Sequence, residues 1–332
     1  MSHCRQLLLI ATAFLCPALA LSDSGDVGPR VDDVLRLLDK HEVLYAEEDI
    51  RRAAIAGLLK AIDSHALLMD SKEAEAMEHM ASVARAEMWP GGIGYVKIQA
   101  LCKGGRKYVE EVIRDWNGSL RGLVLDLRGG AGADLESVEV IAGLFLGPRT
   151  DIYRLVNGRN EPVVTKASRG EQLAEVPPLM LLVDGNTSGA PEALVAVLKG
   201  RRGIMVLGGT TAGDALSRET LPVMKDLSAY IATRGIVPVD GPGYSSSGVS
   251  PDIAVSGAAV VDDPGTQDDS SAVIGENAEV NELLERISQD PVLRRAVDIL
   301  LSLEAMSYGR PEPAGKEDQN AGEGRKNTPG DK

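Results

Sequence analysis

The chain has 332 residues, of which 3% are aromatic and 44% belong to the broad hydrophobic class. Asp and Glu number 49 against 35 Lys and Arg, which gives a formal net charge of −14 at pH 7. A chain this acidic, with so few rings, lacks the basic and aromatic surface that nucleic acids require, and an anionic membrane repels it. Its length allows one to two domains, and we expect no nucleic-acid partner.

The first twenty residues have the pattern of an export signal. Arg5 supplies a positive start, residues 7–15 form a short apolar run, and Ala18 to Ala20 are a small-x-small cleavage pattern. The apolar run is too short to span a bilayer, and the alternative is a buried N-terminal helix. We therefore expect an exported protein, periplasmic or secreted after cleavage near Ala20, with no transmembrane segment in the mature chain.

Cysteine and histidine usage argues against a disulfide and against a metal site. Cys102 is the single cysteine left after cleavage, so an internal disulfide is not possible. The mature histidines, His41, His65 and His79, are not spaced as ligand pairs with one another or with cysteine. We interpret them as surface or capping residues and expect no metal.

Two glycine-rich turns fail the patterns of nucleotide-binding loops. The turn at 128–135 places Leu135 where a dinucleotide fingerprint has its third glycine. The run at 208–214 places Asp214 where a P-loop requires lysine, and a carboxylate there would repel phosphate. We therefore expect no cofactor.

Taken in chain order, the sequence divides into a signal, three folded regions, a linker and a tail. We expect a helical region over 21–90, an α/β core over 91–257, a linker over 258–277, two helices over 278–288 and 291–305, and a disordered tail over 306–332. Asp290 followed by Pro291 is a good start for the second of these helices.

The core alternates buried strands with helices, which predicts an α/β fold with a mainly parallel sheet. Strands are expected over 93–101, 121–128, 179–185 and 203–209, helices over 107–116, 134–146 and 190–199, a hairpin around Asn157-Gly158, and an antiparallel pair that includes 227–235.

Six segments have distinctive sequences and follow one another in a distinctive order. They read RRAAIAGLLKAIDSHALLMD (51–70), IGYVKIQAL (93–101), LRGLVLDLRGGAGADLESVEVIAGLFL (120–146), LMLLVDGNTSGAPEALVAVLKGRRGIMVLGGTTAGDA (179–215), SSGVSPDIAV (246–255) and QDPVLRRAVDILL (289–301). Together they resemble the carboxy-terminal processing, or tail-specific, serine protease family. The resemblance implies a Clp-protease/crotonase-like α/β core. The interval 75–90 is too short for the PDZ domain that the family usually carries there, since a small domain needs about 50 residues.

The catalytic positions depart from the family pattern. The family has a Ser nucleophile three residues before a Glu and a Lys base in an F-G-K-G run. With the Glu at Glu192, the nucleophile position holds Gly189, and without a gap the base position holds Asp214. Ser–Lys acyl transfer needs a hydroxyl and a neutral amine, so the resemblance implies that both are lost. The family's oxyanion-binding backbone positions fall on Gly132 and Ala190.

Ser188 is the best substitute nucleophile, one residue upstream of Gly189. A shift of one residue on a helix turns the side chain by about 100°, so we favour a helix-capping hydroxyl for Ser188. Lys199 and Lys225, the nearest lysines in sequence, are more simply solvated at a helix end and in a hairpin turn. The serines of 245–247 are most simply turn residues.

Two functions follow from these residues. The first is an exported, catalytically inactive homologue that binds or regulates a protein or peptide in the cell envelope, with an active protease relative or another copy of itself as candidate partners. The second is a serine-type peptidase with a displaced nucleophile such as Ser188, or one completed by a partner subunit. The paired loss at Gly189 and Asp214 favours the first. A bare oxyanion hole that binds a carboxylate is a third option.

Overall fold

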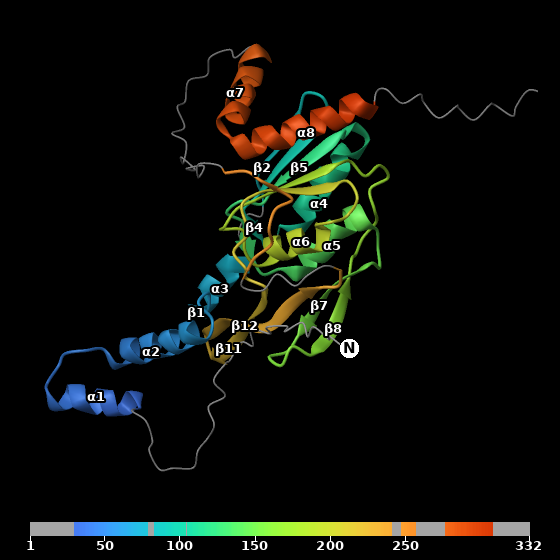
Figure 1. The fold of residues 1–332 in the computed structure, drawn as a ribbon. Helices are drawn as coiled ribbons and strands as arrows, with labels where there is room; N and C mark the ends of the chain where they lie inside the picture. Colours follow the sequence, from blue (N-terminus) through green and yellow to red (C-terminus); the bar gives the residue numbers. More distant parts are fainter. Residues whose placement is uncertain (1–29, 79–82, 104, 241–246, 257–275, 308–332) are drawn as a thin grey trace, which may run out of the picture. The chain divides into compact units, whose positions relative to one another are not determined.

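The computed structural model describes residues 30–78, 83–103, 105–240, 247–256 and 276–307 (Figure 1). The expected signal, His79, most of the expected linker and nearly all of the expected tail lie outside the described residues. The chain divides into two compact units, with the boundary between Leu58 and Leu59. Among the described residues, no helix has both the length and the apolarity to cross a bilayer.

The described residues of the first unit, from Arg30 on, form two helices. Helix α1 (Val31–Lys40) has acidic residues in its first turn and Lys40 in its last, as the helix dipole favours. Helix α2 (Glu47–Ile62) begins in this unit, again with acidic residues in its first turn, and ends in the second. The Arg51 guanidinium joins the two helices, because it contacts Asp32 at 3.0 Å and Glu47 at 2.8 Å.

The second unit contains a six-stranded sheet, counted over the described residues. Its order is β13 (Ile253–Ala254), β10 (Ile204–Gly208), β9 (Leu179–Val183), β5 (Gly122–Asp126), β3 (Ile93–Ile98) and β2 (Val83–Trp89). Pairing is parallel from β3 to β13, and β2 joins antiparallel. The expected mainly parallel α/β core is therefore confirmed. Its strands are continuous apolar runs because both faces of the sheet are covered.

Alternate strand residues enter two separate hydrophobic clusters. On one face Leu123 and Leu125 of β5 pack with α4 (Arg106–Trp116), α5 (Leu135–Leu146) and α6 (Ala190–Leu198). On the other face Val124 packs with α7 (Glu276–Gln289) and α8 (Pro291–Ser307). Successive side chains of a strand point to opposite faces, so these clusters define a three-layer arrangement within this unit (Figure 1). Each of these helices was expected from the sequence.

A second sheet is antiparallel throughout. Strand β12 (Leu227–Pro238) pairs with β1 (Leu67–Asp70), β7 (Asp151–Val156) and β11 (Leu216–Met224), and β7 pairs with β8 (Pro162–Ala167). The hairpins expected at Asn157-Gly158 and at Lys225-Asp226 are confirmed, and Asp226 has the positive φ of a tight turn. A short parallel pair, β4 (Ala100–Leu101) with β6 (Ala131–Gly132), lies apart from both sheets, and Asn117–Ser119 form a 3-10 turn after α4.

The expectation of a helical region over 21–90 is wrong at two places. Strand β1 follows α2, and β2 follows the short helix α3 (Ser71–Glu78). Tertiary pairing explains both, because β1 adds to β12 and β2 pairs with β3. Gly91 and Gly92 form the turn between β2 and β3, each with a positive φ. At the other end, α8 runs to Ser307 and so includes the first residues of the expected tail.

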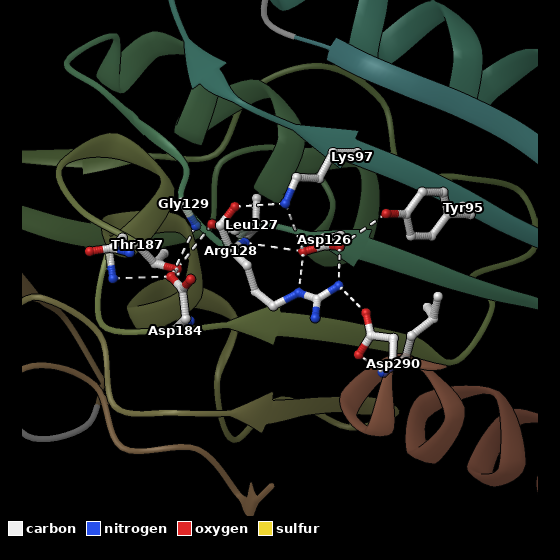
Figure 2. Close-up of polar contacts among 11 residues, drawn as sticks. Tyr95, Lys97, Asp126, Leu127, Arg128, Gly129, Asp184, Thr187 and Asp290 are labelled. Carbon is white, nitrogen blue, oxygen red and sulfur yellow. Dashed lines mark hydrogen bonds and ion pairs between the residues drawn. The ribbon is translucent and has the colours of Figure 1, made fainter. Parts of the chain in front are cut away.

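A buried charge network attaches α8 to the sheet (Figure 2). The Asp126 carboxylate, 1% exposed, accepts hydrogen bonds from the Tyr95 hydroxyl at 3.0 Å and from Arg128 Nη2 at 2.6 Å. The same Arg128 guanidinium contacts Asp290 at 2.7 Å, and the Lys97 ammonium donates to the Arg128 carbonyl at 2.7 Å. Asp290 also caps α8 as expected, since its Oδ1 accepts the backbone N–H groups of the first turn at 3.0 Å.

Charge pairing outweighs desolvation at Asp126. Burial alone would raise the pKa of this carboxyl group, but Arg128 and Lys97 hold its pKa below the usual range. The ionised form is therefore the native one, and three elements, β3, β5 and α8, depend on it.

Asp290→Ala should lower the free energy of unfolding by about 2 kcal/mol, because it removes the cap of α8 and one partner of a largely buried guanidinium. Chemical denaturation at neutral pH measures this difference. Asp298→Ala, which removes an exposed carboxylate from the same helix, is the matched control and should leave stability within about 0.5 kcal/mol of the wild type. Equal effects of the two substitutions would contradict the network.

Acid should destabilise the protein partly through Asp126. Its pKa is lower in the folded state than in the unfolded chain, so its contribution is complete above about pH 4 and is lost as the pH falls through the folded value. Asp126→Asn should lower stability at pH 7 by about 3–5 kcal/mol and should lose less further stability between pH 4 and pH 2. Urea unfolding across this range tests the difference, and a loss equal to that of the wild type would disprove it.

Candidate functional site

A pocket of about 720 Å³ lies where the carboxyl ends of the parallel strands meet the antiparallel sheet. Segments that follow β3, β5, β9 and β10 line it, as expected for binding sites in open α/β sheets. Gly132, Ser188, Gly189 and Asp214 all line this pocket. Ala190 is buried directly behind Gly189 as the first residue of α6. The structure thus brings together the five site residues that the sequence singled out.

Hydrogen bonds join the turn after β5, residues 127–130, to the segment that carries Ser188 (Figure 2). The Thr187 hydroxyl donates to the Leu127 carbonyl at 2.9 Å, and the Gly129 N–H donates to Asp184 Oδ1 at 2.9 Å. The Ser188 N–H donates to the Gly130 carbonyl at 2.9 Å. The turns after β5 and β9 are therefore held as one piece at the edge of the pocket.

Glycine is required at Gly189. This residue precedes α6 with φ +62° and ψ −128°, a backbone conformation that costs other residues free energy. A Cβ atom built here would lie 2.3 Å from the Gly132 carbonyl oxygen. Gly132 is itself constrained, because a Cβ atom on it would lie 2.4 Å from the Leu101 carbonyl oxygen. Three backbone segments meet here without room for side chains between them.

Ser188 is not the helix cap that we favoured. The cap position of α6 is Gly189, and no side chain caps this helix. Ser188 lies one residue before the cap position, so its hydroxyl is not placed to accept the backbone N–H groups of the first helical turn. Its side chain is instead half-buried at the pocket. Pro191 lies in the first turn of α6, as expected.

Glu192 holds the loop that carries Asp214. Its carboxylate is fully buried and accepts hydrogen bonds from the Thr211 hydroxyl and from the N–H groups of Gly213 at 2.7 Å and Asp214 at 2.8 Å. Burial raises the pKa of Glu192, and these three hydrogen bonds only partly offset that effect. The loop after β10 is therefore fixed against the first turn of α6.

Asp214 is neutralised by an arginine that lies between two carboxylates. Arg218 Nη1 and Nη2 contact the two oxygens of Asp214 at 2.7 and 2.9 Å, and its Nε and Nη2 contact those of Asp63 at 2.8 Å each. The Arg218 side chain is 4% exposed. Burial lowers the pKa of Arg218, but the two carboxylates outweigh this and raise it. Four of its five N–H donors are engaged, so little of this cation is free to bind a ligand.

His65 also lies at the pocket. Its Nδ1 is 3.3 Å from Arg218 Nη2 and 4.0 Å from Asp214 Oδ2. The His65 side chain is 60% exposed, so the surface interpretation holds for it, as it does for His41, which follows α1 in an exposed position. No group of His, Cys, Asp or Glu within the described part of the chain is placed to hold a metal ion.

The pocket has a second charged centre that sequence reasoning missed. Glu139 on α5 is buried, and its Oε1 accepts a hydrogen bond from the Tyr153 hydroxyl at 2.9 Å. Arg169 Nε lies 2.6 Å from Glu139 Oε2, and Lys166 Nζ lies 3.8 Å from Oε1. Burial raises the pKa of Tyr153, so its hydroxyl remains a donor. These residues come from α5, β7, β8 and the segment after β8, and no local pattern joins them.

The lysines considered in the sequence lie elsewhere. Lys199 ends α6, where its ammonium contacts the Ser250 carbonyl and lies 3.6 Å from Asp252. Lys225 lies in the β11–β12 turn. Neither lines the pocket. Of the serine triplet, 245 and 246 lie outside the described residues, and Ser247 is a turn residue.

Comparison with known proteins agrees with this core. Residues 92–255 match the sequence model of peptidase family S41. The carboxy-terminal-processing protease of Bartonella bacilliformis is 22% identical over 170 residues, which are 50% of this chain and 39% of that protein. The carboxy-terminal processing protease CtpA of Bacillus subtilis is 22% identical over 169 residues, which are 51% of this chain and 36% of that protein. The chain thus spans well under half the length of these curated relatives.

Among solved structures, a lipoprotein from Streptococcus agalactiae has a TM-score of 0.53 at 15% identity, covering 69% of this chain and 85% of that one. At this identity the likeness concerns the fold alone. The resemblance that six sequence segments carried to carboxy-terminal processing proteases is confirmed, together with the α/β, Clp-protease/crotonase-like class expected from it. The similarity of this chain to peptidase family S41 therefore extends over its core, residues 92–255.

Proposed function

We propose that this chain is an exported, non-catalytic member of the S41 family that holds a segment of another protein in its pocket without cleaving it. One observation carries the proposal. Gly189 stands at the position that the resemblance assigns to the nucleophile, and a Cβ atom there would lie 2.3 Å from the Gly132 carbonyl oxygen. A hydroxyl-bearing side chain therefore has no space at this position of the folded site.

The base position supports the same conclusion. Asp214 gives both carboxylate oxygens to Arg218, and its side chain is 10% exposed. A base for Ser–Lys chemistry must be a neutral amine that reaches the nucleophile. An ionised carboxylate that already neutralises a guanidinium cannot take this part.

The binding part of the site is retained. The N-terminus of α6 faces the pocket at Gly189, and the first N–H groups of a helix carry partial positive charge. With Gly132 beside it, this edge can receive the carbonyl oxygen of a bound peptide as an oxyanion hole does, but no attack on the carbonyl follows. Apolar residues such as Met77, Leu101 and Leu155 supply the remaining contact area.

A displaced nucleophile is the second candidate function. Ser188 favours it, because its side chain lies at the pocket and does not cap α6. A partner subunit could also complete such a site. In this case the chain is a serine-type peptidase, and the same pocket binds its substrate.

Export and partner class belong to the proposal as well. The charge, apolar run and cleavage pattern of residues 1–20 support export to the periplasm or the medium. The occupant of the pocket is a protein or peptide, with an active protease relative or a second copy of this chain as the natural regulatory partners.

Purified residues 21–332 should not react with a fluorophosphonate serine probe and should not digest an unfolded protein. Labelling is read by gel fluorescence and digestion by release of peptides, with Ser188→Ala as the matched variant. Equal, background signals from both proteins agree with the proposal. Labelling and digestion that Ser188→Ala abolishes would replace the proposal by the displaced-nucleophile peptidase.

Gly189→Ser should not create activity, and it should lower the free energy of unfolding by about 2–4 kcal/mol, because the new Cβ atom meets the Gly132 carbonyl in a strained backbone conformation. Thermal and urea unfolding measure this effect. Gly118→Ser is the matched control, since a Cβ atom there meets nothing within 4 Å and no positive φ is involved. A stable, labelled Gly189→Ser protein would show that the nucleophile position remains usable.

A further inference from the structure

Lys166 gives the pocket a positive charge with unused hydrogen-bond donors. It lies on β8 and lines the pocket, and its side chain is 34% exposed. Its contact in the described structure is with Glu139 Oε1, and at 3.8 Å this is an ion pair that is too long for a hydrogen bond. An ammonium group carries three donors, so a ligand oxygen can be received here.

Glu139 does not need Lys166 for its own neutralisation. The Tyr153 hydroxyl donates to Glu139 Oε1 at 2.9 Å, and the Arg169 guanidinium lies 2.6 Å from Oε2. The nearest cation therefore already balances this buried carboxylate. Glu139 positions the Lys166 ammonium at the pocket wall, and a ligand need not displace an existing hydrogen bond to reach it.

The other carboxylates of the lining are engaged or distant. Glu136 pairs with Arg106, and Asp134 accepts the Ser137 hydroxyl at 2.6 Å. Glu219 lies on β11, which is separated from β8 by β12 and β7, a distance of about 14 Å across the sheet. Asp214 is held by Arg218. Glu139 Oε2 has no hydrogen-bond partner within the described structure, but it is buried and lies 2.6 Å from the Arg169 guanidinium. The accessible groups with spare capacity at the pocket are thus donors, namely Lys166 and the N-terminus of α6.

We propose that Lys166 is a specificity-determining residue that receives a carboxylate of the bound peptide. This inference rests on the proposed function, because it assigns the chemistry of the segment held in that pocket. A peptide carbonyl lies against the N-terminus of α6, and a carboxylate of the same peptide lies against Lys166. The carboxylate comes from an acidic side chain or from the C-terminus of the peptide, which offer Lys166 the same chemistry.

The test uses purified residues 21–332 and an array of acetylated hexapeptides. In one set the C-terminus is amidated and Glu, Gln or Lys is fixed in turn at each position, and in a second set the C-terminus is a free carboxylate. The affinities of the best-retained peptides are then measured by isothermal titration. Lys166→Met removes the charge, and Lys166→Arg retains it. Lys107→Met, an exposed residue of α4 outside the pocket, is the charge-matched control.

We expect a Glu peptide, or a free-acid peptide, to bind about tenfold more tightly than its Gln or amidated counterpart. Lys166→Met should abolish this preference and keep the melting temperature of the wild type, while Lys166→Arg and Lys107→Met should retain the preference. Which set shows the preference identifies the source of the carboxylate. Peptide binding without any acidic preference would overturn the inference and leave the proposed function intact. Failure to retain any peptide would overturn both.

Discussion

A single buried carboxylate, Asp126, fixes the turn on which the site is built. It is ionised because Arg128 and Lys97 pair with it, and Arg128 in turn holds the start of α8 through Asp290. The turn after β5 is thereby fixed at its first residues. Its following carbonyl and N–H groups bind the segment after β9, so the charge network determines where Gly189 lies. The position of the site therefore depends on the ion pair between Asp126 and Arg128 at the start of this turn.

At the pocket, backbone atoms fill the space beside Gly189, where our proposal places the lost nucleophile. Gly189 lies against the Gly132 carbonyl, and Gly132 lies against the Leu101 backbone, so closely that neither position tolerates a side chain. The loop after β10 is also held in place, because Glu192 accepts hydrogen bonds from its backbone and Arg218 pairs with Asp214. These contacts stabilise the fold and, under the proposed function, engage the positions that proteolysis would require. A family fold is therefore compatible with a function in binding.

Much of this architecture could be read from the chain. The buried strands, the helices between them and the hairpins are local patterns, and the site glycines were located because they occupy motif positions with fixed spacing. Strand β1 was missed because its partner, β12, is distant in sequence, whereas β2 was missed although it forms a hairpin with the neighbouring strand β3. The capping interpretation of Ser188 failed by one residue, because α6 has Gly189 at its cap position.

The sequence by itself determined the class of fold, the order of the core elements and the chemical types that are absent from the expected catalytic positions. These properties follow from periodicity and residue identity, which are local. Only the tertiary structure decided which charged groups surround these positions. Arg218 meets Asp63, which lies 155 residues earlier in the chain, and Glu139 contacts Tyr153, Lys166 and Arg169 from other segments. Pairing of buried charges is a property of three-dimensional proximity, and a single sequence does not record which distant partners meet.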